Sequence, residues 1–300
     1  MRKDSHGLSV VIAAVNGFPA LKDCLGSLSQ QSGVDELEVI VANRRSDGLG
    51  KVLRQKYPWV KLIEAPPHTT IPQLRALAFR EVSAEVVAVL EDHCIVEKDW
   101  ALRIIAAHEV DHPVIGGSVE NAACERLVDW AAFFCEYSQA MKPMQGGEVD
   151  AVPGNSVSYK KWVLEQFRKD LEAGEWDFVL HEHIKNGNIP LYSIPSITVY
   201  HKMSASLGWY LLQKFHFARS YAGKRFVDAK WPQRAVYGTG AFLLPILLLG
   251  RIVPGVWNKR KHRRELLLSL PFLSMLFLSW GLGEVAGYFF GTGSSPTKVC

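Results

Sequence analysis

Mostly apolar runs alternate with amphipathic stretches along the N-terminal part of the chain. The apolar runs are rich in β-branched residues and end at polar or glycine-containing breaks, which is typical of strands buried on both faces. They are Leu8–Val15, Leu37–Ala42, Val60–Glu64 and Val86–Leu90. The stretches between them carry apolar residues at helical spacing, at residues 19–31, 49–57 and 72–82. This alternation predicts right-handed βαβ units and an α/β fold with a largely parallel sheet flanked by helices.

Polar residues gather where three of these strands end. The breaks are Val15-Asn16, Asn43–Asp47 and Glu91–His93. Because the carboxyl ends of parallel strands lie at one edge of the sheet, ligands of such sheets bind there. The pattern therefore predicts one binding site built from these three loops.

After residue 100, the sequence predicts both helices and short strands, without the regular alternation of the first hundred residues. Helical spacing predicts helices at 124–141, 160–172 and 177–186, and shorter runs predict strands at 149–152 and 191–199. Residues 206–229 then combine aromatic side chains with lysine and arginine. We expect this stretch to form a helix along a membrane interface, with a packed amphipathic helix of a soluble domain as the alternative.

Two strongly apolar stretches follow, at Tyr237–Val253 and Leu266–Phe290. The first has about the minimum length that spans a bilayer, and the second is long enough to cross with some tilt. The positive-inside rule assigns the basic segment between them, Asn258–Arg264, to the cytoplasm. If both stretches spanned, this segment and the N-terminal domain would lie on opposite faces. We therefore favour a re-entrant or interfacial first stretch and keep a spanning hairpin as the alternative. Glu284 is expected to face a partner helix or the interface, because a carboxylate that faces lipid is costly.

The composition changes this picture in three ways. With 48% hydrophobic and 21% charged residues, the chain is not disordered. Its net charge of +4 is too small to indicate a nucleic-acid partner, and the basic residues collect at 224–234 and 259–264, which suits an anionic membrane surface. The five cysteines form no CxxC pair, and their odd number favours a reducing cytosol. Residues 1–7 are polar, so we expect no secretory signal at this end.

The segment Glu91-Asp92-His93 places two carboxylates and an imidazole at the tip of a buried strand. Hard divalent cations take one or two carboxylates from the protein and further oxygens from substrate phosphates. A metal held there would neutralise and orient a diphosphate leaving group. An acidic pair after a strand is also common as a solvated turn, so the prediction depends on the two neighbouring loops.

Four segments in this order resemble the family-2 glycosyltransferases of the GT-A fold, inverting enzymes that use nucleotide-diphosphate sugars. They are Leu8–Gly17, Ile71–Arg75 with Ala78, Leu90–Cys94 with Trp100, and Pro153–Tyr159. The resemblance covers roughly residues 8–225. It implies a GT-A-like catalytic domain at 1–205, an amphipathic interfacial region at 206–234 and membrane-associated hydrophobic segments at 235–300.

The resemblance also implies which residues line or support the nucleotide-sugar pocket. They are Ala13, Asn16, Asn43, Asp47, Arg75, Glu91, Asn155 and Arg219. The family usually has an Asp for the base or ribose where this chain has Ala42-Asn43, so Asn43 would contact the base and Asp47 fits the later acidic position. Asn155 would contact the sugar or the acceptor. Arg219 would clamp a phosphate or contact lipid headgroups.

The same resemblance implies the metal ligands and the general base. The first and last acids of the metal motif are here Glu91 and His93, so Asp92 is the expected ligand, while His93 would bind the metal or a phosphate. The base is placed at Asp177, with Glu175 as the second choice, because the family carries an acidic residue at a helix start in that place. A carboxylate there would also suit the helix N-terminus for structural reasons alone.

These features together predict a membrane-associated inverting glycosyltransferase that uses Mg²⁺ or Mn²⁺ and a nucleotide-diphosphate sugar. The expected acceptor is lipid-linked or a cell-envelope glycan, with the catalytic domain at the cell membrane and facing the cytoplasm. The alternative from another class is a non-catalytic membrane scaffold that kept the fold. A nucleotidyl- or phosphoryl-transferring enzyme is disfavoured, because the chain has no GxxxxGK[ST] phosphate loop.

Overall fold

In the computed structural model, which describes residues 6–46 and 48–299, the N-terminal apolar runs form the parallel half of one sheet. The strands are β1 (Leu8–Ala14), β2 (Leu37–Asn43), β3 (Val60–Glu64) and β4 (Val86–Glu91). Their spatial order is β3-β2-β1-β4, and every neighbouring pair is parallel. The helices that connect them are α1 (Phe18–Ser29), α2 (Leu49–Lys56) and α3 (Ile71–Phe79), with the short 3-10 helix η1 (Val34–Glu36) before β2. The predicted βαβ order is confirmed.

The other half of the sheet is antiparallel, so the sheet is mixed rather than largely parallel. Its strands are β5 (Cys94–Val96), β6 (Val114–Asn121), β7 (Gly147–Val149), β8 (Val157–Lys160) and β9 (Leu191–His201). β8 runs antiparallel to β4 and to β6, and β5 and β7 both run antiparallel to β9. These strands are short or carry glycine and polar residues, so they lack the apolar runs by which β1 to β4 are recognised.

The helices beside this half fit the predicted positions only in part. They are α4 (Trp100–His108), α6 (Lys161–Gln166), α7 (Arg168–Glu172) and α8 (Asp177–Asn186). α8 has the predicted bounds, whereas the single helix expected at 160–172 is divided at Phe167, and α4 is not predicted. The start of α8 at Asp177 places a carboxylate in the first turn of that helix.

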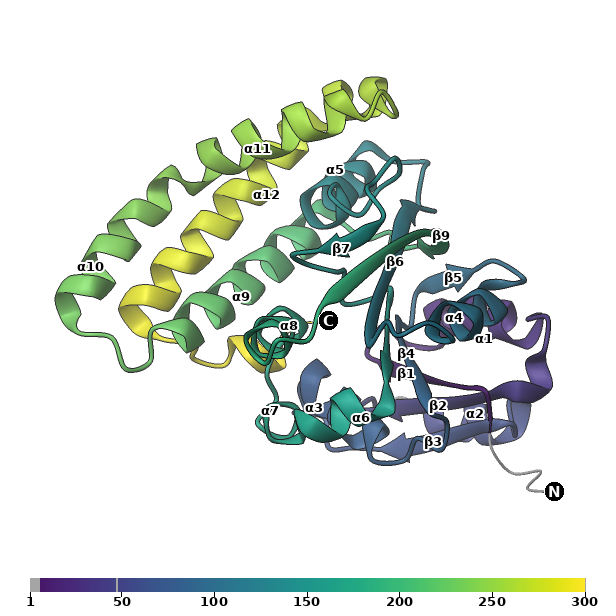
Figure 1. Ribbon diagram of the computed structural model, residues 1–300. Helices are drawn as coiled ribbons and strands as arrows, with labels where there is room; N and C mark the ends of the chain where they lie inside the picture. The colour runs from purple at the N-terminus through teal and green to yellow at the C-terminus, as the bar shows by residue number, and fades with distance from the viewer. Residues whose placement is uncertain (1–5, 47, 300) are drawn as a thin grey trace. The chain divides into compact units, whose positions relative to one another are not determined.

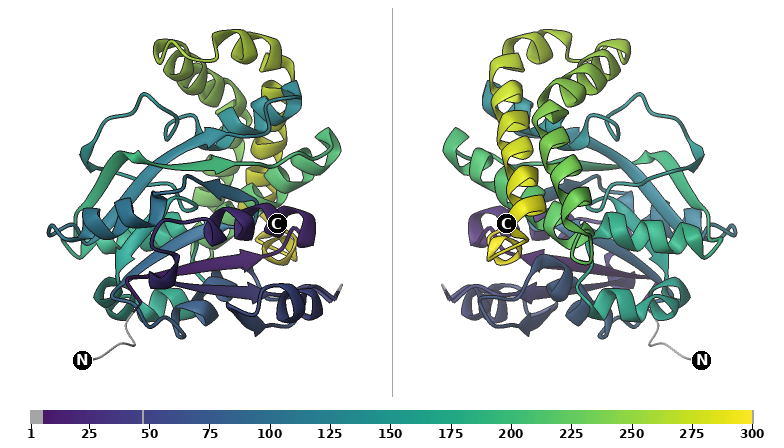
Figure 2. Two further views of the ribbon diagram at one scale, coloured as in Figure 1. Left: turned by 90° about the vertical axis from the view of Figure 1, so that its right-hand side faces the viewer. Right: turned by 90° about the vertical axis from the view of Figure 1, so that its left-hand side faces the viewer.

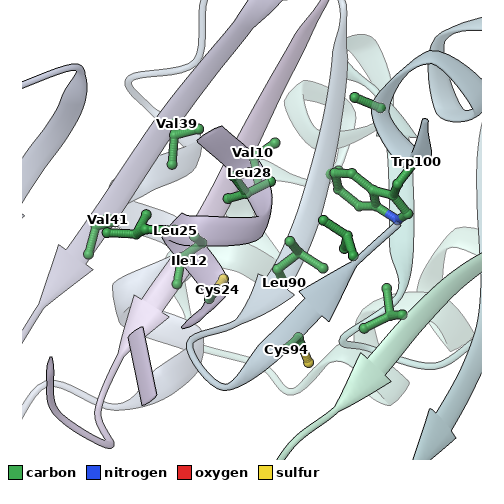
Figure 3. Close-up of a cluster of buried hydrophobic side chains, with 14 of the residues drawn as sticks. Val10, Ile12, Cys24, Leu25, Leu28, Val39, Val41, Leu90, Cys94 and Trp100 are labelled. Carbon is green, nitrogen blue, oxygen red and sulfur yellow. The ribbon is translucent and has the colours of Figure 1, made fainter. Parts of the chain in front are cut away.

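Both faces of β1, β2 and β4 are largely buried, whereas β3 lies at the edge of the sheet and is only partly buried. Val10 and Ile12 of β1 point into one apolar cluster, where they meet Leu25 and Leu28 of α1 (Figure 3). Val11 of the same strand points into a second cluster on the opposite face. Burial on both faces explains why β1 has an almost unbroken apolar sequence, and it fixes the level at which the strand ends.

Contacts divide the chain into two units, the first formed by residues up to Glu120 with Ala140–Lys202, and the second by Asn121–Gln139 with residues from Met203 onward. The sheet belongs to the first unit. The second unit contains α5 (Leu127–Tyr137), α9 (Leu207–Arg225), α10 (Trp231–Gly240), α11 (Leu244–Asn258) and α12 (Arg263–Phe290), with the short 3-10 helices η2 (Ala241–Leu243) and η3 (Ser295–Thr297). The functional division expected at 205/206 stays a prediction. By contacts, residues 121–139 belong to the second unit because α5 packs along α12.

Within the second unit, α12 lies between α9 on one side and α10–α11 on the other (Figures 1 and 2). In the described part of the chain, the continuous helical stretches Trp231–Asn258 and Arg263–Phe290 are long and apolar enough to cross a membrane. The helix expected at 206–229 is α9, which begins after the N-cap Ser206.

Candidate functional site

The strand register brings the three predicted loops to one level at the edge of the sheet. Ala13 of β1 pairs with Ala42 of β2 on one side and with Glu91 of β4 on the other. The chain therefore leaves β1, β2 and β4 at neighbouring points. The predicted convergence of these loops is confirmed for the described residues.

Asp92 ties the loop after β1 to the end of β4. Its side chain is 1% exposed, and Oδ2 accepts hydrogen bonds from the backbone amides of Val15 and Asn16, both at 2.7 Å. Oδ1 accepts from Asn16 Nδ2 at 2.8 Å and lies 3.0 Å from His93 Nδ1. Burial alone would raise the pKa of the Asp92 carboxyl, but the contact with His93 and the bonds from Asn16 outweigh it and hold that pKa below its ordinary value. Asp92 is therefore an anion that shapes the loop.

A second group of side chains offers ligand atoms to a single point. One atom each from Glu91, His93 and His201 lies within 4.8 Å of the others. His93 Nε2 is 2.9 Å from His201 Nε2 and 3.4 Å from Glu91 Oε2, and His201 Nε2 is 3.8 Å from the same Glu91 oxygen. Burial, and then the nearby His93, hold the pKa of His201 well below its ordinary value, which favours the neutral imidazole that metal ions bind.

The geometry favours a set of metal ligands different from the one expected from the sequence, which centred on Asp92. A carboxylate has about four lone-pair positions, and those of Asp92 already face Val15, two groups of Asn16, and His93. Glu91 and the two histidines are instead directed at one another. The structure thus favours Glu91, His93 and His201 over Asp92 as direct ligands, with Asp92 orienting His93 from behind.

Asn155, from the turn before β8, extends this group. It is 1% exposed, and its Nδ2 donates to Glu91 Oε2 at 3.2 Å and lies 3.8 Å from Cys94 Sγ. Its Oδ1 has no hydrogen-bond partner among the described residues. A buried acceptor without a partner is costly, so this oxygen is suited to receive a donor from a bound ligand.

Asp177 lies at the start of α8 and forms an ion pair with Arg75 of α3. Arg75 is 4% exposed, whereas the Asp177 side chain retains 28% exposure. The neighbour of Asn155 in the turn, Gly154, passes so close to Asp177 that a Cβ there would lie 2.2 Å from Oδ2. One turn, Gly154-Asn155, therefore contacts both Asp177 and Glu91 and brings the predicted base and the candidate metal group to one site.

Three other predicted residues have local roles. Asn43 is buried and shapes its own loop, because its Oδ1 accepts from Arg45 N at 2.9 Å. Arg219 belongs to the second unit, where its Nε donates to the carbonyl of Gly291 at 3.0 Å. Glu175 lies two residues before Asp177, outside the helix. Asp47 lies outside the described residues.

The sequence gives little indication of His201. It is the last residue of β9, far from the acidic segment along the chain, and reaches it because β9 pairs with β5 in register Cys94 to His201. The one signal in the sequence is a histidine at the end of β9, directly after the short run Ile197-Thr-Val-Tyr200. Arg45 is a second addition, since its Nη1 donates to the carbonyl of Val15 at 2.9 Å beside the same edge.

Comparison with known structures supports this fold. Over 93% of this chain and 90% of the other, the structure is similar to TarS of S. aureus (residues 1–349, in complex with UDP-GlcNAc), with 12% identity and a TM-score of 0.53. Over 96% and 88%, it is similar to the mannosyltransferase PcManGT of Pyrobaculum calidifontis, in complex with GDP-Man and Mn²⁺, with 15% identity and a TM-score of 0.57. At this identity the likeness concerns the fold alone.

Sequence comparison identifies the family. No curated protein sequence matches the chain. The model of glycosyl transferase family 2 matches residues 9–167. This match includes β1 to β4, the Glu91–His93 segment and the Gly154-Asn155 turn. The chain belongs to glycosyl transferase family 2.

Proposed function

We propose that this protein transfers one sugar, with inversion, from a nucleotide-diphosphate donor to an acceptor hydroxyl, assisted by a divalent cation. The observation that carries the proposal is the convergence of Glu91, His93 and His201 within 4.8 Å beside the loop at Asn16. Family membership supports sugar transfer. The ligands of the similar structures, UDP-GlcNAc in TarS and GDP-Man with Mn²⁺ in the mannosyltransferase, support the class of donor.

The residues at this point fit a metal ion. His93 can direct Nδ1 to Asp92 and leave Nε2 for the ion, the arrangement in which an outer carboxylate fixes a histidine ligand. One carboxylate with two imidazoles favours a transition-metal ion such as Mn²⁺ over Mg²⁺, which prefers oxygen ligands. When bound, the cation would neutralise charge on the leaving diphosphate.

Asp177 is the proposed general base. Its partly exposed carboxylate would accept the proton of the acceptor hydroxyl while that oxygen forms a bond to the anomeric carbon of the donor. The bond between the anomeric carbon and the diphosphate oxygen breaks, and the nucleoside diphosphate leaves on the opposite side. Arg75 holds the carboxylate in position, and Asn155 presents its unpartnered carbonyl to a hydroxyl of the sugar or acceptor.

The acceptor is proposed to be lipid-linked or a cell-envelope glycan. The support is the pair of apolar helical stretches in the second unit, which would keep the enzyme at a membrane. We place the first unit on the cytoplasmic side, where nucleotide sugars and reduced cysteines are expected. Of the described cysteines, Cys24, Cys94 and Cys135 have free thiols.

The test compares two histidines of the same unit. His201→Ala should abolish calorimetric Mn²⁺ binding and Mn²⁺-dependent turnover of a panel of nucleotide sugars. His183→Ala should change neither, because His183 is exposed and pairs with Asp170 outside the candidate metal group. Equal Mn²⁺ binding by both variants would refute the metal assignment. A folded wild-type protein that binds Mn²⁺ but turns over no donor would favour the non-catalytic scaffold.

A further inference from the structure

The long helices of the second unit expose many large apolar side chains. On α12, five exposed apolar positions form one stripe, which we call the outer stripe: Leu267, Leu268, Met275, Leu278 and Leu282. Apart from the adjacent pair Leu267–Leu268, successive members are three, four or seven residues apart, which places them on one face of the helix. On the neighbouring α10–α11 stretch, Phe242, Ile246 and Leu247 are each more than 60% exposed. An exposed apolar surface of this extent is unusual for a soluble monomer and indicates a binding surface.

The inner face of α12 is covered from end to end. Near its start, the His262 ring lies 4.6 Å from the Trp130 ring of α5, and Lys259 Nζ donates to the carbonyl of Gln139 at 3.1 Å. Further along, Ser279 Oγ donates to the carbonyl of Leu211 in α9 at 2.7 Å. Gly287 contacts Ala222 so closely that a Cβ there would lie 2.7 Å from it. α5 and α9 thus accompany α12 over its whole length.

The covering helices carry charged groups in their buried positions. Lys214 of α9 is 5% exposed and forms an ion pair with Glu136 of α5. Asp129 of α5 is 3% exposed, accepts a hydrogen bond from Tyr210 Oη at 2.9 Å, and lies 3.7 Å from Arg126. If α12 crossed a bilayer in this arrangement, these groups would enter the hydrocarbon layer with it, which is costly.

Both ends of the helical hairpin carry an exposed tryptophan beside exposed basic residues. At the start of α10 these are Trp231, Arg225 and Lys230. At the turn between α11 and α12 they are Trp257, Arg260 and Lys261, with Arg263 stacked on Trp257 at 4.6 Å from the ring. Tryptophan and basic residues are enriched where a protein meets the headgroups of anionic lipids. In a spanning hairpin the two ends would face opposite leaflets, about 42 Å apart for a helix of this length.

We infer that the second unit binds one leaflet of an anionic bilayer from a single side. α10–α11 and α12 lie in the plane of that leaflet with the outer stripe in the acyl region, while both basic ends contact headgroups and α5 and α9 stay toward water. This inference rests on the proposed membrane association and not on sugar transfer. Under this inference, the two helical stretches that are long enough to span a bilayer act instead as a surface anchor.

The first experiment measures sidedness in sealed membrane vesicles of known orientation that contain the full chain. Single cysteines replace Asp111, Lys230 and Lys261 in a background with Cys124→Ser and Cys300→Ser, and a membrane-impermeant maleimide is added from each side. Asp111 has a 99% exposed side chain and reports the side of the first unit. All three positions should react from the same side. Reaction of the cysteine at 261 from the opposite side alone would overturn the inference and establish a spanning hairpin.

The second experiment measures binding of the purified chain to preformed vesicles. Arg260→Ser with Lys261→Ser should weaken binding to phosphatidylglycerol-containing vesicles about 25-fold, because each basic residue near an anionic surface contributes about fivefold. Leu278→Glu should weaken binding to these and to neutral vesicles, whereas Lys51→Ser on the first unit should change neither. Circular dichroism checks that Leu278→Glu keeps its helices. Wild-type protein that binds no vesicle would overturn the inference even if it transfers sugar.

Discussion

The two units of this protein distribute apolar and polar side chains in opposite ways. In the first, both faces of β1, β2 and β4 are apolar and largely buried, and polar groups gather where these strands end. In the second, Lys214 and the carboxylate of Asp129 are buried, and many large apolar side chains of α10 to α12 are exposed. The first unit thus gathers polar groups at one edge of its sheet, whereas the second leaves apolar side chains exposed on its long helices.

The largest effect is expected at the proposed base of the first unit. Asp177→Asn should lower kcat about 10³-fold, because the acceptor hydroxyl loses its proton acceptor while the side chain keeps its size beside Gly154. Steady-state kinetics with Mn²⁺ and the donor give kcat and KM separately. Glu175→Gln, two residues earlier and outside the helix, should change kcat little. A larger loss for Glu175→Gln than for Asp177→Asn would assign the base to Glu175.

A smaller effect is expected behind the candidate metal group. Asp92→Asn should weaken Mn²⁺ binding by about 10- to 100-fold, since it leaves Glu91, His93 and His201 in place but removes the carboxylate that orients His93. Calorimetric titration with Mn²⁺ measures this directly. Complete loss of Mn²⁺ binding, as severe as in His201→Ala, would make Asp92 a direct ligand and contradict the set favoured by the structure.

The packing of α9 on α12 in the second unit can be tested by substituting two glycines of its long apolar helices. Gly287→Leu should destabilise the protein by about 1–3 kcal/mol, because its Cβ would meet Ala222 and the carbonyl of Arg219 at 2.7 Å. Gly250→Leu should cost nothing, since no atom lies within 4 Å of a Cβ at that exposed position. Thermal unfolding in detergent compares them. Equal melting temperatures would show that α9 does not pack on α12 as described.

The last effect concerns the dependence of stability on pH in the first unit. Burial lowers the pKa of His108 in the first unit to about 4, and its Nε2 is 2.8 Å from Ser158 Oγ. The unfolded chain binds this proton more readily than the folded protein does. The His108 contribution to the free energy of unfolding is therefore complete above the ordinary histidine pKa. It falls by up to about 1.4 kcal/mol per pH unit as the pH drops from about 6.5 to 4. Urea unfolding at several pH values should show this slope. His108→Gln should flatten it, and an unchanged slope in that variant would exclude His108 as its source.

β1, β2 and β4 can be predicted because their apolar runs are buried on both faces, and β3 is recognised by its short run of Val60, Leu62 and Ile63 between predicted helices. β5, β6 and β8 cannot, since Gly116 and Gly117 interrupt β6, and β5 and β8 are only a few residues long. The same contrast holds for the site. Glu91, Asp92 and His93 follow a recognisable strand, whereas His201 joins them only through the pairing of β9 with β5.

The sequence by itself determined the family, the βαβ order, the strand-end loops and the apolar character of the C-terminal stretches, because periodicity and motif order are local properties. Only the tertiary structure decided which side chains meet at the sheet edge, since the hydrogen bonds of Asp92 and the approach of His201 to Glu91 and His93 depend on strands far apart in the sequence. It also assigned α5 to the second unit, where α5 and α9 cover one face of α12. Hydropathy measures how apolar a helix is, but the neighbours of that helix determine which of its faces remains free to meet lipid.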